Sequence, residues 1–188
     1  VSSAASDVYK RQVLDTIISN DVDAEGGIPV GKLVEISGEA ATGKSLLSYM
    51  ILKDCQDKGG QPILIDTENA ANWSFLKLLG LKAQEEGGNL LYLQVDSVEK
   101  VFQAIEQIIR TVRENHKDRL CCIVWDSVAG TSTDTEIQNE YGEATIGLAA
   151  RLIGQGLRKS IRFIGTQRVS LVFLNQVRHK IGLSLIHM

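Results

Sequence analysis

The sequence has few of the features that mark secreted or membrane-embedded proteins. It contains no run of about eighteen apolar residues, so it predicts no transmembrane helix. It also shows no basic segment followed by an apolar stretch near its start, which predicts no secretory signal. The three cysteines, Cys55, Cys121 and Cys122, lack the spacing of a metal site. We therefore expect buried, reduced thiols in a cytoplasmic protein.

The sequence also lacks an excess of positive charge. Its formal net charge is −3, which argues against a surface that binds nucleic acid or membrane over its whole extent. Any such surface must be local. With 188 residues, 44% of them hydrophobic and 23% charged, the chain is typical of one globular domain with a core of its own.

The two ends differ in pattern from the rest of the chain. Residues 1–12 (VSSAASDVYKRQ) and 183–188 (LSLIHM) share neither periodicity nor turn signals with the sequence between them. They resemble translated adapter sequence at the edges of a reading frame. We expect both segments to be non-native, and residues 13–182 to form a single core domain.

Between these ends, short apolar runs alternate with helical patterns. Near-continuous apolar strands separated by helices are typical of a parallel sheet buried on both faces. The sequence therefore predicts a doubly wound α/β fold, which binds ligands at the carboxyl ends of its strands. The expected strands are Leu33–Ser37, Pro62–Asp66, Leu90–Val95, Leu120–Asp126 and Ser170–Gln176. The expected helices are Lys44–Asp57, Trp73–Leu79, Val98–Val112 and Ala144–Lys159, with a polar loop at Thr131–Glu143.

One segment matches the phosphate-loop pattern G-x-x-x-x-G-K-[ST] in full. It directly follows the first expected strand and opens the first expected helix, which is the context that the pattern requires. Backbone N–H groups would cradle phosphate, the lysine would reach the outer phosphates, and the serine hydroxyl would coordinate Mg²⁺. The nucleotide-binding residues are Gly38, Glu39, Ala40, Ala41, Thr42, Gly43, Lys44 and Ser45.

Polar side chains also end the other strands. Asp126 is placed to hold Mg²⁺ through water, although an aspartate that ends a strand is often only a cap. Asp66 and Glu68 are both candidates for the general base, and spacing alone does not choose between them. The amides that end the last strand, Asn175 and Gln176, suit a contact with the γ-phosphate. Asn72, Trp73 and Phe75 fit a base-binding role, with core packing as the alternative reading of the aromatic residues.

The helix after the polar loop has a positively charged face. Arg151, Gln155, Arg158 and Arg162 share one side of it, while Leu152, Ile153 and Leu157 point elsewhere. In an acidic protein such a stripe indicates either a polyanion-binding surface or a solvated helix face, and spacing leaves both open.

Taken in order, these segments resemble the RecA recombinase family. The resemblance rests on GGIPVGKLVEISGEAATGKS, LIDTENA, VWDSVAG, GLAARLIGQGLRK and FLNQVRHKIG, and it covers about Gly26 to Gly182. It implies a three-layer P-loop ATPase core that binds ATP and Mg²⁺. It assigns catalytic roles to Glu68, Lys44 and Gln176, metal binding to Ser45 and Asp126, and adenine contacts to Asn72 and Phe75.

The same resemblance implies DNA as a partner. Gln138–Gly147 is similar to a first DNA-binding loop and Val177 onward to the start of a second. Arg151, Arg158, Arg178 and Lys180 match basic positions near single-stranded DNA. The family implies a helical filament on single-stranded DNA, with ATP between subunits, that pairs the strand with a homologous duplex. No membrane partner is expected.

The sequence leaves the family pattern after Gly182, within the second DNA-binding loop. We therefore expect a fragment of a recombinase that contains the ATPase core. A stand-alone ATP-binding regulatory module and a helicase-type ATPase of the same superfamily are the alternatives. The GLAAR segment after a short polar loop favours the recombinase over the helicase.

Overall fold

The computed structural model describes residues 14–15, 17–18, 26–139 and 147–177. The strands in this part of the chain are β1 (Leu33–Gly38), β2 (Gln61–Asp66), β3 (Leu91–Gln94), β4 (Cys121–Asp126) and β5 (Val169–Gln176). The helices are α2 (Lys44–Asp57), α3 (Trp73–Leu78), α4 (Val98–Asn115), α5 (Asp134–Gln138) and α6 (Leu148–Ile164), with 3₁₀ turns at Gln84–Glu86 and Val128–Gly130.

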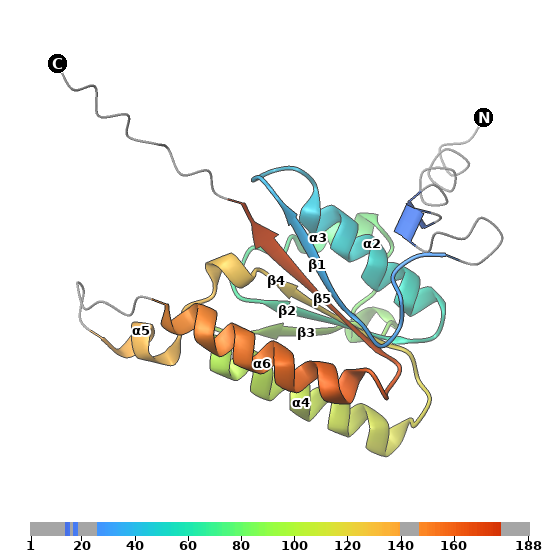
Figure 1. Ribbon diagram of the computed structural model, residues 1–188. Coiled ribbons are helices and arrows are strands. Elements are labelled where there is room, and N and C mark those ends of the chain that lie inside the picture. The colour runs from blue at the N-terminus through green and yellow to red at the C-terminus, as the bar shows by residue number, and fades with distance from the viewer. Residues whose placement is uncertain (1–13, 16, 19–25, 140–146, 178–188) are drawn as a thin grey trace.

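The strands form one parallel sheet in the order β1-β5-β4-β2-β3. Helices α2 and α3 lie on one face of the sheet, and α4 and α6 lie on the other (Figure 1). The predicted three-layer, doubly wound α/β architecture is therefore confirmed. Because every strand runs in the same direction, the loops that follow β1, β2, β4 and β5 meet at one edge of the sheet.

The alternation of side chains along each strand divides the core into two layers. Ile63, Ile65 and Trp125 pack toward α4 and α6, whereas Leu64 and Val124 pack toward α2. All five are fully buried, which explains why the strands have continuous apolar runs. Cys121 and Cys122 face opposite layers for the same reason, and they and Cys55 are buried free thiols, as the sequence predicted.

Helices α4 and α6 pack closely against each other on their face of the sheet. Ser97 caps α4, whose apolar stripe is buried as its periodicity predicted. A Cβ at Gly156 would come within 2.3 Å of the Phe102 ring, so a glycine at this position lets the two helices approach. Lys159 also forms an ion pair with Glu106 across the helices. No helix in the described residues is long and apolar enough to cross a membrane.

The structure corrects two boundaries of the prediction. The expected polar loop Thr131–Glu143 contains the short helix α5, which begins with a capping box between Thr133 and Glu136. The next helix was predicted to end at Lys159 but runs to Ile164, because the buried Ser160 and Ile164 continue its inward face. Residues 144–146 of its predicted start, and the terminal segments 1–12 and 183–188, lie outside the described residues.

Candidate active site

The phosphate-loop segment forms a tight turn between β1 and α2. Gly43 has φ 92° and serves as the N-cap of α2 without any side-chain cap, while Ala41 also has a positive φ of 58°. A Cβ placed on Gly43 would meet no atom within 4 Å, so the space in front of the helix start is open. The left-handed conformation at Gly43 favours glycine, and it leaves the first N–H groups of α2 available to an anion.

The lysine of the loop folds back onto the loop backbone. Lys44 Nζ donates to the carbonyl oxygens of Gly38 at 3.0 Å and Glu39 at 2.6 Å. Thr42 Oγ1 also donates to the Glu39 carbonyl at 2.9 Å. These contacts hold the ammonium group against the loop, where a phosphate oxygen would compete for it.

The two predicted metal-binding residues are in direct contact. Ser45 Oγ, at the start of α2, donates to Asp126 Oδ2, at the end of β4, across 2.8 Å. Burial raises the pKa of the Asp126 carboxyl. The hydrogen bond from Ser45 and the charge of Lys44 oppose that rise, whereas the carboxylates of Glu68 and Asp66 add to it.

This chemistry fits a nucleotide-bound Mg²⁺ ion. Mg²⁺ in such sites usually takes one or two protein oxygens and completes its shell with water and phosphate. Ser45 and Asp126 supply a hydroxyl and a carboxylate of this kind. Within the described residues, no group of three or more His, Cys, Asp or Glu side chains is arranged to hold a metal ion. The chemistry of Ser45 and Asp126 is thus compatible with a metal ion that is bound together with a nucleotide.

The structure separates the two acidic residues that follow β2. Asp66 is only 3% exposed, and its carboxylate accepts hydrogen bonds from the backbone N–H groups of Glu68, Ala70 and Ala71 and from the Tyr92 hydroxyl, at 2.9–3.3 Å. Both of its oxygens are thus engaged in shaping the turn. Glu68 is exposed and its side chain points back toward β4, so it is the better placed of the two to meet a substrate.

The Glu68 carboxylate lies against the turn after β4. Ser127 Oγ donates a short hydrogen bond to Glu68 Oε1, and the N–H of Gly130 donates to the same hydroxyl at 3.3 Å. The Asp126–Ser127 peptide bond is cis. Sequence reasoning missed a role for Ser127 and Gly130. The only signal was their position, since both closely follow a strand that ends in a candidate metal residue.

The predicted γ-phosphate sensor lies beside the phosphate loop. Gln176 ends β5 in register with Gly38 of β1, and the N–H of the next residue, Val177, donates to the Gly38 carbonyl at 3.0 Å. The neighbouring amide is used differently, because Asn175 Nδ2 donates to Glu35 Oε1 at 2.9 Å. Of the two amides, Gln176 is the one in register with the loop.

The residues expected to contact a base have mixed environments. The Asn72 side chain caps α3 by accepting from the Phe75 N–H at 3.1 Å. The Phe75 ring packs against Tyr49, with ring centroids 6.3 Å apart, at the margin of the core. Trp73 is 40% exposed and contacts the Tyr92 ring edge-on. The adenine contacts of Asn72 and Phe75 remain predictions.

The charged face of α6 is open to solvent. Arg151, Gln155, Arg158 and Arg162 are all exposed, while Leu152 and Ile153 pack against the core. This arrangement agrees with the predicted separation of faces but does not identify a ligand. Arg178 and Lys180 lie outside the described residues.

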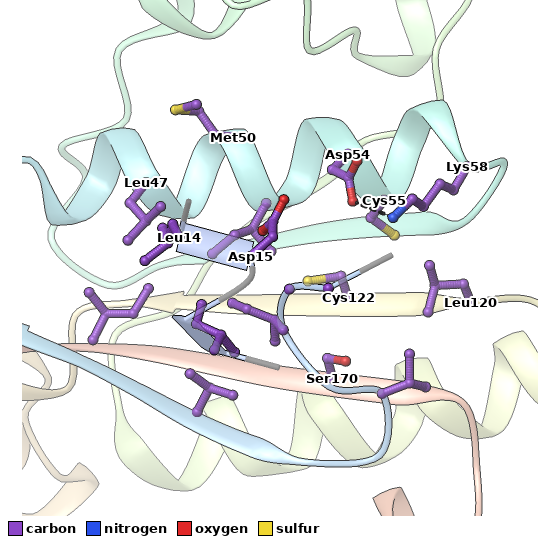
Figure 2. Close-up of a pocket in the computed structure, with 18 of the residues that line it drawn as sticks. Leu14, Asp15, Leu47, Met50, Asp54, Cys55, Lys58, Leu120, Cys122 and Ser170 are labelled. Atoms are coloured by element: carbon purple, nitrogen blue, oxygen red, sulfur yellow. Dashed lines mark ion pairs between the residues drawn. The ribbon is translucent and has the colours of Figure 1, made fainter. Parts of the chain in front are cut away.

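An apolar cavity of about 620 Å³ lies between α2 and β1, apart from the phosphate loop. Leu14 and Leu47 lie toward one end of it, and Cys55 and Lys58 lie toward the other (Figure 2). An ion pair of 3.0 Å joins Lys58 to Asp54. None of residues 38–45 is among the described residues that line this cavity, so we do not assign the nucleotide to it.

Comparison with known proteins places these features in a family. The model of the RecA N-terminal domain matches residues 12–187. The chain is 37% identical over 158 residues to Protein RecA of Wolinella succinogenes, covering 84% of this chain and 42% of that protein. It is 33% identical over 181 residues to Protein RecA of Legionella pneumophila, with 89% and 49% covered. For Protein RecA of Helicobacter pylori the identity is 36% over 158 residues, with 84% and 43% covered. The chain thus spans less than half the length of these relatives, and it belongs to the RecA family.

Proposed function

We propose that the chain is the ATPase core of a recombinase that binds ATP and Mg²⁺ and acts on single-stranded DNA. The observation that carries this proposal is the contact between Ser45 and Asp126, with Glu68 at the end of the neighbouring strand. A phosphate loop, a metal-supporting carboxylate and a candidate base therefore meet at one edge of the sheet. Membership of the RecA family supports the link to recombination.

Each residue at this edge has a distinct role in the proposed reaction. Lys44 leaves the carbonyls of Gly38 and Glu39 and neutralises the outer phosphates of ATP. Ser45 and Asp126 would hold Mg²⁺, which when bound would supply positive charge beside the phosphates. Glu68 accepts a proton from the water whose oxygen bonds to the γ-phosphorus, as the bond from that phosphorus to the bridging oxygen breaks and ADP leaves. Gln176 contacts the γ-phosphate and responds to its loss.

The exposed charged face of α6 is the proposed DNA contact. Arg151 and Arg158 are exposed on one side of α6, and α6 covers the face of the sheet opposite α2 (Figure 1). Exposed arginines on one helix face suit phosphate contacts, which give binding that depends on salt and not on base sequence. A filament of subunits on single-stranded DNA, with ATP between neighbours and a homologous duplex as the second substrate, completes the proposed activity.

The test is ATP hydrolysis by the 188-residue chain with Mg²⁺, with and without single-stranded DNA. We expect hydrolysis that DNA stimulates. The double variant Arg151→Glu/Arg158→Glu should lose the stimulation and bind DNA more weakly, with unchanged affinity for ATP. Arg110→Glu, which changes an exposed arginine of α4, is the matched control and should behave as wild type. The same assay on a chain extended to the length of its relatives decides between the alternatives: if the extended chain binds ATP but never responds to DNA, the recombinase is contradicted and the ATP-binding module is supported.

A further inference from the structure

The contact between Glu68 and Ser127 links two turns that follow neighbouring strands. Ser127 is 5% exposed, and its hydroxyl accepts from the Gly130 N–H while it donates to Glu68 Oε1. Because the amide occupies an acceptor position on the hydroxyl oxygen, the hydroxyl proton is directed at the carboxylate. Among the residues that the structure describes, none donates a hydrogen bond to Glu68 Oε2.

Gly130 lies against the same carboxylate. A Cβ at this position would stand 2.4 Å from Glu68 Oε1 and 2.8 Å from Glu68 Cδ. Any larger residue would therefore displace the glutamate. Glu68 is exposed, and an exposed glutamate ordinarily samples several rotamers. The hydrogen bond from Ser127 and the close approach of Gly130 together restrict the rotamers of this side chain.

The backbones of the two turns are held in register by other hydrogen bonds. The Thr67 N–H donates to the Asp126 carbonyl at 2.8 Å, and Thr67 Oγ1 lies 3.0 Å from the Ser127 carbonyl oxygen. Thr131 Oγ1 lies 2.9 Å from Thr67 Oγ1 and accepts from the buried indole N–H of Trp125 at 3.0 Å. The positions from which Glu68 and Ser127 reach each other are therefore fixed by the fold.

We propose that Ser127 is a positioning residue for Glu68, and that the Glu68 side chain packs against Gly130. Ser127 holds one carboxylate oxygen and leaves the other to orient the attacking water. This inference rests on the proposed ATPase function, because it assigns a task to the base of that reaction. A reacting group misplaced by about 1 Å can cost roughly a hundredfold in rate, so loss of the anchor should affect turnover and not binding.

The kinetic test compares Ser127→Ala with Ser132→Ala, which alters an exposed serine in the same segment. We expect Ser127→Ala to lower kcat by about tenfold to a hundredfold with unchanged affinity for ATP, and Ser132→Ala to leave both unchanged. Gly130→Ala should lower kcat by displacing Glu68. In a Glu68→Gln background, Ser127→Ala should cause no further loss. A further loss there, or an unchanged kcat in Ser127→Ala, would overturn the proposal.

A second measurement does not depend on turnover. NMR couplings between Hα and Hβ of Glu68 report whether its side chain keeps one rotamer. We expect one rotamer in the wild type and in Ser132→Ala, and averaged couplings in Ser127→Ala. Averaging already in the wild type would overturn the anchor. A wild-type chain without hydrolysis would overturn the proposed function instead, and the couplings would still decide whether Ser127 holds Glu68.

Discussion

Polar side chains gather at both ends of the sheet, but they bond to different partners at each end. At the amino ends of β2, β4 and β5, Arg113 donates to the carbonyl oxygens of His116, Arg119 and Arg168, and Arg119 donates to that of Gly59. At the carboxyl ends, side chains bond to the backbone and also to one another. Three such pairs are Ser45 with Asp126, Ser127 with Glu68 and Tyr92 with Asp66.

The difference teaches how to separate structural from functional polar groups. Arginines that donate to backbone carbonyls join the loops between elements, because a charged donor strengthens each hydrogen bond. At the carboxyl ends, burial raises the pKa of Asp126, the charges of Glu68 and Asp66 add to that rise, and the Ser45 hydrogen bond and the charge of Lys44 oppose it. Acidic groups beside a phosphate loop repel one another and the phosphates, and a cation bound with the nucleotide would offset that repulsion. Changes at the two ends should therefore affect different properties.

The largest expected effect is on hydrolysis at the carboxyl end. Glu68→Gln keeps the size of the side chain and its contact with Ser127 but removes the proton acceptor. We expect the hydrolysis rate to fall by about 10²–10⁴-fold, with unchanged ATP binding and unchanged stability. Single-turnover hydrolysis and equilibrium binding measure the two effects. Glu85→Gln, in the 3₁₀ turn before β3, is the matched control, and equal losses in both variants would refute the role of Glu68.

The next effect is on nucleotide binding. Lys44→Ala removes the ammonium that the loop holds between the carbonyls of Gly38 and Glu39. We expect ATP affinity to fall by about a hundredfold, the equivalent of roughly 3 kcal/mol for lost charged hydrogen bonds. Titration calorimetry measures it, with Lys53→Ala on the same helix as the control. Full affinity in Lys44→Ala would contradict the assignment of the loop as the phosphate site.

The sequence predicted the carboxyl end much better than the amino end. A phosphate loop has a fixed spacing, and a parallel sheet brings the ends of its strands together, so the sequence alone predicted Ser45 and Asp126 at one site, although not their direct hydrogen bond. It was not enough to pair Ser127 with Glu68, because that contact depends on how two turns face each other. Arg113 carried no signal either, since its partners are backbone carbonyls from two separate loops and have no side-chain pattern.

Stability should change most at the amino end. Arg113→Ala leaves the carbonyl oxygens of His116, Arg119 and Arg168 without their guanidinium donor. We expect a loss of about 2 kcal/mol in the free energy of unfolding, measured by urea denaturation, with unchanged ATP affinity. Arg110→Ala, on the same helix, is the control and should unfold like the wild type. A comparable loss in Arg110→Ala would mean that the effect comes from the charge of α4 and not from these carbonyls.

The smallest expected effect is a gain in stability at the carboxyl end. Burial raises the pKa of Asp126 in the folded chain above its ordinary value of 3.8, so the charged carboxylate is less favourable folded than unfolded at neutral pH. The stabilising contribution of this group is therefore present at acidic pH, below its unfolded pKa, and is lost as the pH rises through the raised value. Without nucleotide, Asp126→Asn should be slightly more stable than the wild type at pH 7, and the difference should shrink toward pH 3.

Addition of Mg²⁺ and ADP should reverse that order. Both ligands bind the folded wild-type chain and raise its unfolding midpoint, whereas Asp126→Asn has lost the carboxylate that supports the metal. Asp118→Asn, on an exposed turn, should follow the wild type under every condition. If Asp126→Asn were no more stable than the wild type at pH 7 without nucleotide, the Asp126 carboxylate would stabilise the fold, as Arg113 is expected to do at the amino end. If instead the order reverses with ligand, the chain gives up stability at Asp126 in order to hold a cation there.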